Sequence, residues 1–186
     1  MTSTRTRALD AAVELLGTGG LRALTHARVD EHANLPKGST SNHFRTRAAL
    51  LSGVVDWIAA HELRDLGGGE FLPTTPAELV DLMCGFLDHL TGVDRTWTAA
   101  RLVLFMEAGH EPGLRDALSR VRAVMEQSLV AVLTKLGAPD PLTAAQAIAA
   151  CCEGVILHRV ARDDRTDPRP MLELVVHGAF PREETI

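Results

Sequence analysis

Residues 25–44 read THARVDEHANLPKGSTSNHF, and this stretch decides the fold of the 186-residue chain. Thr25 is a good N-cap for a short helix, because its hydroxyl can accept a hydrogen bond from a backbone N–H of the first turn. Asn34 tolerates the left-handed conformation that a tight turn requires. Pro36, with its fixed φ, suits the first turn of a second short helix that ends near His43. The stretch therefore predicts two short helices joined by a turn.

The second of these helices is unusually polar. Residues 37–43 read KGSTSNH, in which six of the seven residues are polar and none is acidic. A surface helix normally carries an apolar stripe that packs on the core. Here the apolar anchors, Leu35 and Phe44, stand only at the two ends, so the middle of the helix faces a polar partner. These proportions match a helix-turn-helix, whose second helix lies in the major groove of DNA.

The side chains of this region fit the chemistry of DNA. Asn pairs well with adenine, Ser and Thr meet base edges or the thymine methyl group, and cations bind phosphates. Arg5 either reaches phosphate or the minor groove, or belongs to a solvated tail. The residues predicted to contact DNA are Arg5, Thr25, Arg28, Lys37, Gly38, Ser39, Thr40, Ser41, Asn42, His43 and Arg47.

The rest of the chain predicts an all-α protein. Apolar residues recur at spacings of 3, 4 and 7, and no segment alternates with period two over a strand length. Helices are expected over about 5–16, 25–33, 36–43, 46–66, 79–91, 96–108, 114–136, 142–162 and 171–179. Three cysteines, an odd number, exclude a disulfide scaffold and indicate reduced thiols. Without an apolar leader, we expect a soluble cytoplasmic protein.

The charge is divided unevenly along the chain. The formal net charge is −5, which at first argues against a nucleic-acid partner. Residues 1–47, however, hold seven Lys or Arg against four Asp or Glu, whereas the remainder holds 12 against 20. A modestly basic head on an acidic body weakens non-specific DNA binding by the body and leaves the head its phosphate contacts. Gly67-Gly68-Gly69 predicts the boundary between a DNA-binding domain over 1–66, whose last helix is the connector, and a second domain over 70–186.

Residues 5–60 resemble the N-terminal DNA-binding domain of the TetR family of bacterial transcriptional regulators. The resemblance is carried by Ala11-Ala12, Leu16, Gly20, Thr25, Val29, Ala33, Lys37-Gly38-Ser39, His43-Phe44, Arg47 and Leu50-Leu51. The chain has Asn34 where the family usually has Gly, Pro36 where it has Ser, and Ser41 where it has Tyr. Losing the Tyr removes a phosphate or base contact that the family often uses.

The resemblance implies a homodimeric repressor whose two recognition helices read a palindromic operator in double-stranded DNA. It also implies a C-terminal helical domain that binds a small molecule and then spreads the two heads, so that affinity for the operator falls. The alternative on the same fold is an effector-less DNA-binding protein or a protein–protein adaptor. We expect no enzyme and no cofactor, because a nucleophile elbow, a phosphate-binding Gly-rich loop after a strand and a paired-carboxylate motif are all missing from the sequence.

A ligand pocket of the family type would be lined by large side chains at helical spacing. Trp97, Arg101 and Phe105 recur on one helix face, and Met83, Phe86 and Met125 on neighbouring helices would complete the walls. The alternative is ordinary core packing. If Arg101 points inward, it needs a carboxylate partner or an anionic ligand, which would favour an acidic or polar effector.

The segment over 142–162 is small or apolar on nearly every side, as in a helix buried on more than one face. By the resemblance, it and the last helix would pack against their twins as a four-helix bundle. The residues predicted at this dimer interface are Ala147, Cys151, Gly154, Val155, His158, Leu172 and Val176. Cys151 and His158 share a face, but the sequence has no CxxC or HxxxH pair, so no metal site is predicted.

Overall fold

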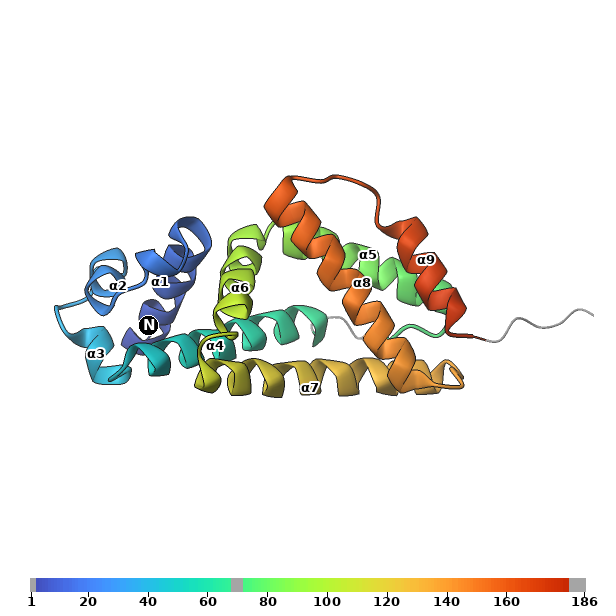
Figure 1. The fold of residues 1–186 in the computed structure, drawn as a ribbon, viewed down its shortest axis with the longest axis horizontal. Coiled ribbons are helices and arrows are strands. Elements are labelled where there is room, and N and C mark those ends of the chain that lie inside the picture. The colour runs from blue at the N-terminus through green and yellow to red at the C-terminus, as the bar shows by residue number, and fades with distance from the viewer. Residues whose placement is uncertain (1–2, 68–71, 181–186) are drawn as a thin grey trace, which may run out of the picture. The chain divides into compact units, whose positions relative to one another are not determined.

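The computed structural model describes residues 3–67 and 72–180, and within these ranges the protein is entirely helical (Figure 1). The nine α-helices of the described residues confirm the predicted all-α class. They are α1 (Thr4–Gly19), α2 (His26–His32), α3 (Ser39–His43), α4 (Arg47–Gly67), α5 (Pro76–Thr91), α6 (Arg95–Glu107), α7 (Pro112–Lys135), α8 (Pro141–Arg162) and α9 (Arg169–Gly178). A short 3₁₀ helix over Leu21–Ala23 joins α1 to α2.

The chain forms two compact units. Unit 1 contains residues 1–67 and 94–121, and unit 2 contains residues 68–93 and 122–186. The helix α6 and the first part of α7 therefore fold with the N-terminal helices, although the sequence boundary assigned them to the second domain. Gly68 and Gly69 of the predicted boundary lie outside the described residues, and the division at 66 and 70 stays a prediction.

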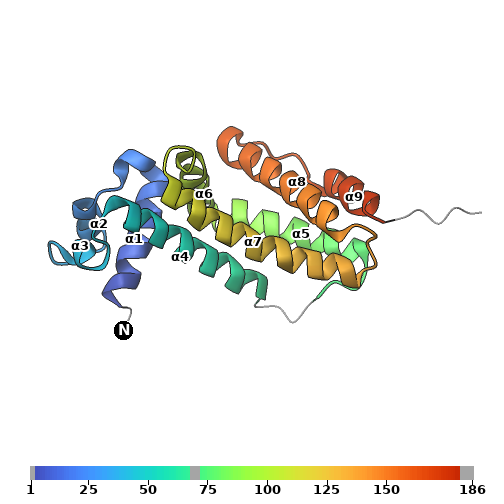
Figure 2. The ribbon, with the colours of Figure 1, turned by 60° about the horizontal axis from the view of Figure 1, so that its bottom comes forward.

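Unit 1 is organised around α1, which contacts α2, α3, α4 and α6 (Figures 1 and 2). Its core includes Leu9, Leu16 and Leu104, each at most 1% exposed. The backbones of α1 and α6 approach so closely at Gly17 that a Cβ there would lie 2.2 Å from the carbonyl oxygen of Thr96. This contact requires glycine for its lack of a side chain.

Unit 2 is built from α5, α8, α9 and the last part of α7, and α5, α8 and α9 contact one another pairwise. Two ion pairs reinforce the packing on α5: Arg159 of α8 donates to Asp88 at 2.7 Å, and Arg169 of α9 lies 2.7 Å from Asp81. These contacts hold both C-terminal helices to α5 and fix which of their faces stay open.

Local signals predicted most helix ends. Thr25 Oγ1 accepts from the backbone N–H of Arg28 at 3.2 Å, and Thr46 Oγ1 accepts from that of Ala49 at 3.0 Å. Asn34 has a φ of 51°, which confirms the left-handed turn. The start of α3 is a correction: it lies at Ser39 and not at Pro36, because residues 36–38 form a turn that ends in the left-handed Gly38, with a φ of 88°.

Candidate DNA-binding site

The helices α2 and α3 and the turn between them form a helix-turn-helix. The turn passes through the left-handed residues Asn34 and Gly38, which redirect the chain so that α3 contacts both α2 and α1. Phe44, just after α3, is buried at 5% exposure, and Leu35 in the turn packs against the same core. Both anchors thus lie where the sequence predicted, and the last three residues of α3 are exposed.

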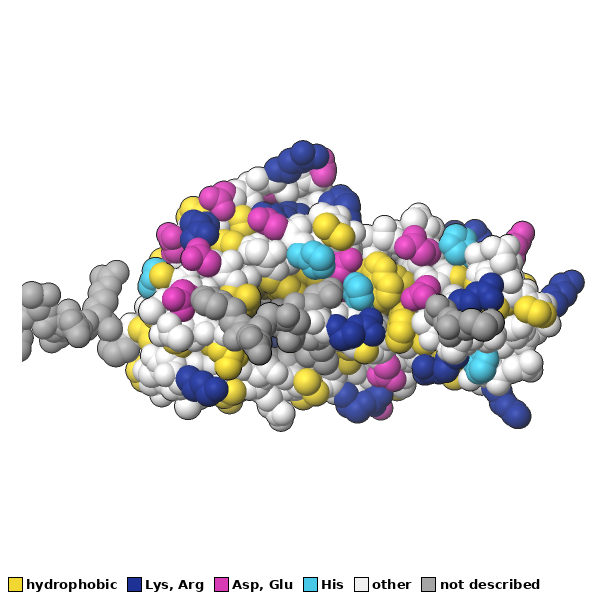
Figure 3. Space-filling view, turned by 180° about the vertical axis from the view of Figure 1, so that it is seen from behind, with side chains coloured by type: hydrophobic (Ala, Val, Ile, Leu, Met, Phe, Trp, Pro, Cys, Tyr) yellow, Lys and Arg dark blue, Asp and Glu magenta, His cyan; other side chains and the backbone are white. Residues whose placement is uncertain are grey.

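The exposed residues at the start and along the last part of α3 are polar. Lys37 in the turn and Ser41, Asn42 and His43 on α3 are all exposed. Ser39 is half-buried, and its hydroxyl donates to the Pro36 carbonyl at 2.6 Å, so it holds the turn. In Figure 3, Lys and Arg side chains project from the end of the view formed by the first helices. The predicted base-contacting residues that face solvent are therefore Ser41, Asn42 and His43, with Lys37 beside them.

Thr40 is a correction to the predicted set. It is 0% exposed, and its hydroxyl and its backbone N–H both donate to Asp30 Oδ1, at 2.5 and 2.8 Å. A residue buried in this way cannot reach a base edge. The polar pattern of 37–43 could not reveal this, because the partner is a carboxylate ten residues earlier.

Asp30 was missed by the sequence analysis. It is a buried carboxylate, 3% exposed, and its Oδ2 also accepts from the backbone N–H of Gly38 at 2.7 Å. Burial raises the pKa of this carboxyl, but the hydrogen bonds from Thr40 and Gly38 and the nearby His26 outweigh it, so the pKa lies below its usual value. Asp30 is therefore held as an anion under the start of α3.

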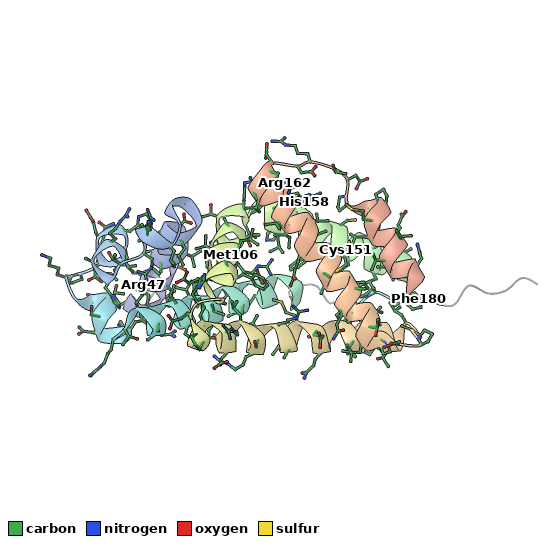
Figure 4. The ribbon with its side chains drawn as sticks, in the orientation of Figure 1. Arg47, Met106, Cys151, His158, Arg162 and Phe180 are labelled. Atoms are coloured by element: carbon green, nitrogen blue, oxygen red, sulfur yellow. The ribbon has the colours of Figure 1, made fainter. Side chains whose placement is uncertain are left out.

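Arg47 also makes contacts within the protein that the sequence did not predict. Its guanidinium donates to the carbonyls of Leu24 at 2.6 Å and Leu21 at 2.9 Å, so it ties α4 to the segment before α2 (Figure 4). Arg7 is engaged in the same manner, by the carbonyls of Ala33 and Asn34 at 2.5 and 3.1 Å. These two cations help to position the motif, and the phosphate contact of Arg47, whose side chain is exposed, stays a prediction.

The remaining predicted cations are exposed. Arg28 projects from α2, and Arg5 from α1 lies over the Phe44 ring at 5.5 Å from its centroid. Thr25 is exposed as the N-cap of α2. Lys37 completes this group, and the exposed Arg45 lies just after α3, so several cations near α3 are open to phosphates.

The predicted ligand-binding residues lie in both units. In unit 1, Trp97 stacks on His61 with ring centroids 4.1 Å apart, and Phe105 is 52% exposed. Arg101 does have the carboxylate that its burial demanded: Glu62 of α4, 3% exposed, lies 3.2 Å away. Arg101 thus has a carboxylate partner, so its position alone gives no reason to expect an acidic effector, and its role in binding a ligand stays a prediction.

The space beside Arg101 within unit 1 is small. A cavity of about 20 Å³ is lined by Glu62, Arg101 and apolar residues of α4, α6 and α7. That volume holds about one water molecule. In unit 2, Met83, Phe86 and Met125 are all half-buried. Their role in binding a ligand stays a prediction.

Some of the predicted dimer residues are exposed or half-buried in the single chain, and the others are buried inside unit 2. Ala147 and His158 are exposed on α8, and Cys151 and Gly154 are half-buried on the same helix (Figure 4). Val155, Leu172 and Val176, in contrast, are at most 8% exposed and belong to the interior of unit 2, because α5, α8 and α9 close over them. On the outside of the same helices, Leu157 is 48%, Met171 42% and Leu174 77% exposed.

The fold and this motif define a class: an all-helical protein with an N-terminal helix-turn-helix for DNA. Comparison with known families agrees. The family described as "Bacterial regulatory proteins, tetR family" matches residues 8–54, and "Tetracyclin repressor-like, C-terminal domain" matches residues 74–182, which is more than half of the chain. The chain belongs to the TetR family, and it is a DNA-binding transcriptional regulator by fold.

Solved structures with the same fold cover almost the whole chain. The multidrug binding protein EbrR complexed with imidazole is 26% identical, with a TM-score of 0.74, over 97% of this chain and 92% of that one. EbrR complexed with ethidium is 25% identical, with a TM-score of 0.78, over 97% and 100%. A TetR family member from Streptomyces coelicolor A3 is 24% identical, with a TM-score of 0.78, over 97% and 100%. No curated protein matches the chain in sequence.

Proposed function

We propose that this protein is a homodimeric, cytoplasmic repressor that binds a palindromic operator in double-stranded DNA and is released by a small-molecule effector. One observation carries the proposal: Lys37, Ser41, Asn42 and His43 are exposed beside a buried scaffold. Asn42 supplies the side chain that pairs with adenine, and Lys37 supplies a phosphate contact. Two copies of these residues, one set from each subunit, would read two half-sites about one helical turn apart.

The proposal is tested on a duplex that the wild-type protein enriches from a random-sequence pool. The double variant Lys37→Ala, Asn42→Ala is expected to bind that duplex about 100-fold more weakly, since it loses one base contact and one phosphate contact. Lys135→Ala, Gln127→Ala is the matched control, because it removes the same chemistry from exposed positions of α7. Equal binding by the first variant and wild type would contradict the placement of the recognition helix.

Dimerisation through α8 and α9 is part of the proposal. Among the described residues, α8 is the one helix long and apolar enough to cross a membrane by length and composition, yet only 28% of its apolar window is buried. A second copy would cover its small open residues Ala147, Cys151 and Gly154, together with Met171 and Leu174 of α9. These last two replace Leu172 and Val176 in the proposed interface.

The effector is supported by EbrR, which is solved in complex with ethidium and with imidazole. Ethidium is therefore the first probe, used on the protein without DNA because it also intercalates in duplexes. Binding is expected to raise the melting temperature with increasing ethidium concentration. Release from the operator would then correspond to a coupling of about 1–3 kcal/mol, or a roughly 5- to 150-fold change in affinity.

One observation favours the alternative, a DNA-binding protein or adaptor without an effector. Arg101 is paired with Glu62, and the cavity beside them has a volume of only about 20 Å³. Under this alternative the melting temperature stays constant as ethidium is added, while the selected duplex still binds. The two measurements together separate the two functions.

A further inference from the structure

The recognition helix α3 cannot hold its own position. It has five residues, and the backbone hydrogen bonds at its ends include Asn42 N–H to the Gly38 carbonyl at 3.0 Å and Phe44 N–H to the Thr40 carbonyl at 2.8 Å. Helices this short are unstable in isolation, because nucleation fixes several residues for each hydrogen bond gained. The orientation of α3 must therefore be set by contacts from other elements.

Asp30 provides those contacts at the start of α3. Its two carboxylate oxygens accept three hydrogen bonds, from the backbone N–H groups of Gly38 and Thr40 and from the Thr40 hydroxyl. Its backbone carbonyl accepts a fourth, from the Leu35 N–H at 2.8 Å. Hydrogen bonds to a buried carboxylate are about twice as strong as neutral ones. One residue thus fixes both the turn and the first residues of the helix.

A second side chain of α2 holds the other end. His26 lies one helical turn before Asp30, so the two share a face of α2. Its Nε2 donates to the carbonyl of Phe44 at 2.7 Å, immediately after α3. One face of α2 therefore holds α3 by hydrogen bonds at its beginning and just after its end. Ser41, Asn42 and His43 of α3 remain exposed.

We propose that Asp30 is a positioning residue for sequence-specific DNA recognition, whose carboxylate fixes the orientation of Lys37 and Asn42 and adds nothing to non-specific binding. The inference rests on the proposed DNA-binding function. An anion beneath a DNA-binding surface repels phosphates, so removal of its charge alone strengthens binding to any sequence. If neutralising Asp30 instead lowers the affinity for the operator, this electrostatic effect cannot be the cause. The loss would then show that the Asp30 carboxylate positions α3.

The experiment compares Asp30→Asn with Glu31→Gln. Both variants remove one negative charge from α2, but Glu31 is exposed whereas Asp30 is buried. The probes are the duplex enriched by wild type and a shuffled duplex of the same length and composition, with dissociation constants measured by fluorescence anisotropy. If wild type enriches no duplex, the proposed function fails before Asp30 is tested.

We expect Asp30→Asn to bind the enriched duplex roughly tenfold more weakly, because α3 is then docked in only a small fraction of the molecules. Its binding to the shuffled duplex stays within about twofold of that of Glu31→Gln, as both variants change the phosphate attraction equally. Equal affinity of the two variants for the enriched duplex would overturn the inference. So would an equal loss on both duplexes by a folded Asp30→Asn variant.

Variants of Thr40 test the inference if the circular dichroism of Asp30→Asn shows that this variant does not fold. Thr40→Val removes the hydroxyl donor and keeps the shape of the side chain, and Thr40→Ser restores the donor. The inference requires that Thr40→Val weakens binding to the enriched duplex several-fold with little change on the shuffled one, and that Thr40→Ser recovers most of the loss. Wild-type affinity in Thr40→Val would refute it.

Discussion

The helices α3 and α8 each present to solvent a face that an ordinary surface helix lacks. In α3 the exposed face is polar and free of acids, and its one buried side chain, Thr40, is polar as well. In α8 several exposed or half-buried positions carry small or apolar residues, among them Ala147, Cys151 and Leu157. Under the proposed function, the polar exposed face of α3 suits DNA, and the small and apolar positions of α8 suit a second copy of the chain.

The largest effect is expected from a charge placed on α8. Gly154→Arg meets no atom within 4 Å of its new Cβ, so the single chain accommodates it. In the proposed dimer, the arginine would be buried without a partner, and the variant should be monomeric by sedimentation. Operator affinity should then fall about 100-fold or more, because two linked half-sites become one.

The control for that variant is Gln127→Arg, which adds the same charge to an exposed position of α7. It should remain dimeric and bind DNA normally. A dimeric Gly154→Arg protein would show that the open face of α8 does not mediate self-association. The proposed assignment of a partner would then hold for α3 alone.

Replacing a glycine by alanine should lower the free energy of unfolding where the glycine is packed against a neighbouring helix, and raise it where the glycine is exposed. Gly17→Ala places a Cβ 2.2 Å from a backbone oxygen of α6, and such overpacking costs about 1–3 kcal/mol of unfolding free energy. Gly85→Ala on α5 meets nothing within 4 Å and should gain about 0.5–1 kcal/mol from reduced backbone entropy in the unfolded chain. Urea denaturation measures both. A stable Gly17→Ala protein would mean that α1 and α6 separate easily.

Acid should weaken the scaffold of α3 selectively. The pKa of Asp30 is lowered in the folded protein, so its contribution to stability is present above the ordinary value of about 4 and is lost as the pH falls through the folded value. The stability difference between wild type and Asp30→Asn, about 1–3 kcal/mol at neutral pH, should shrink below pH of about 4. Urea titrations across this range check the sign. A difference that grew toward acid pH would contradict the lowered pKa.

The smallest effect separates the two arginines that the sequence treated alike. Arg28→Ala should weaken binding to every sequence a few-fold and reduce the salt slope by about one, as expected for one phosphate contact. Arg47→Ala should instead lower the melting temperature, because it frees the carbonyls of Leu21 and Leu24. If Arg47→Ala showed the same loss of affinity and salt slope as Arg28→Ala, with no lower melting temperature, Arg47 would act as a phosphate contact.

Most features that were predicted correctly depend on residues close together in the sequence. The apolar periodicity located the helices, and Thr25, Asn34 and Thr46 marked caps and a turn, since each acts on residues three or four positions away. The functions of Thr40, Arg47 and Arg101 depend on partners 10 to 39 residues away, namely Asp30, Leu21 and Leu24, and Glu62. No periodic signal reports such pairs, so the sequence could not show that these side chains also support the fold.

The division of labour within α3 also bears on how such a protein can acquire new targets. The atoms that hold the helix belong to Asp30, His26 and Thr40, whereas the atoms that face solvent belong to Lys37, Ser41, Asn42 and His43. Because the two sets share no side chain, under the proposed function the solvent-facing residues can be exchanged without disturbing the contacts that hold α3. A library randomised at those four positions alone can be selected for a different operator on an unchanged scaffold.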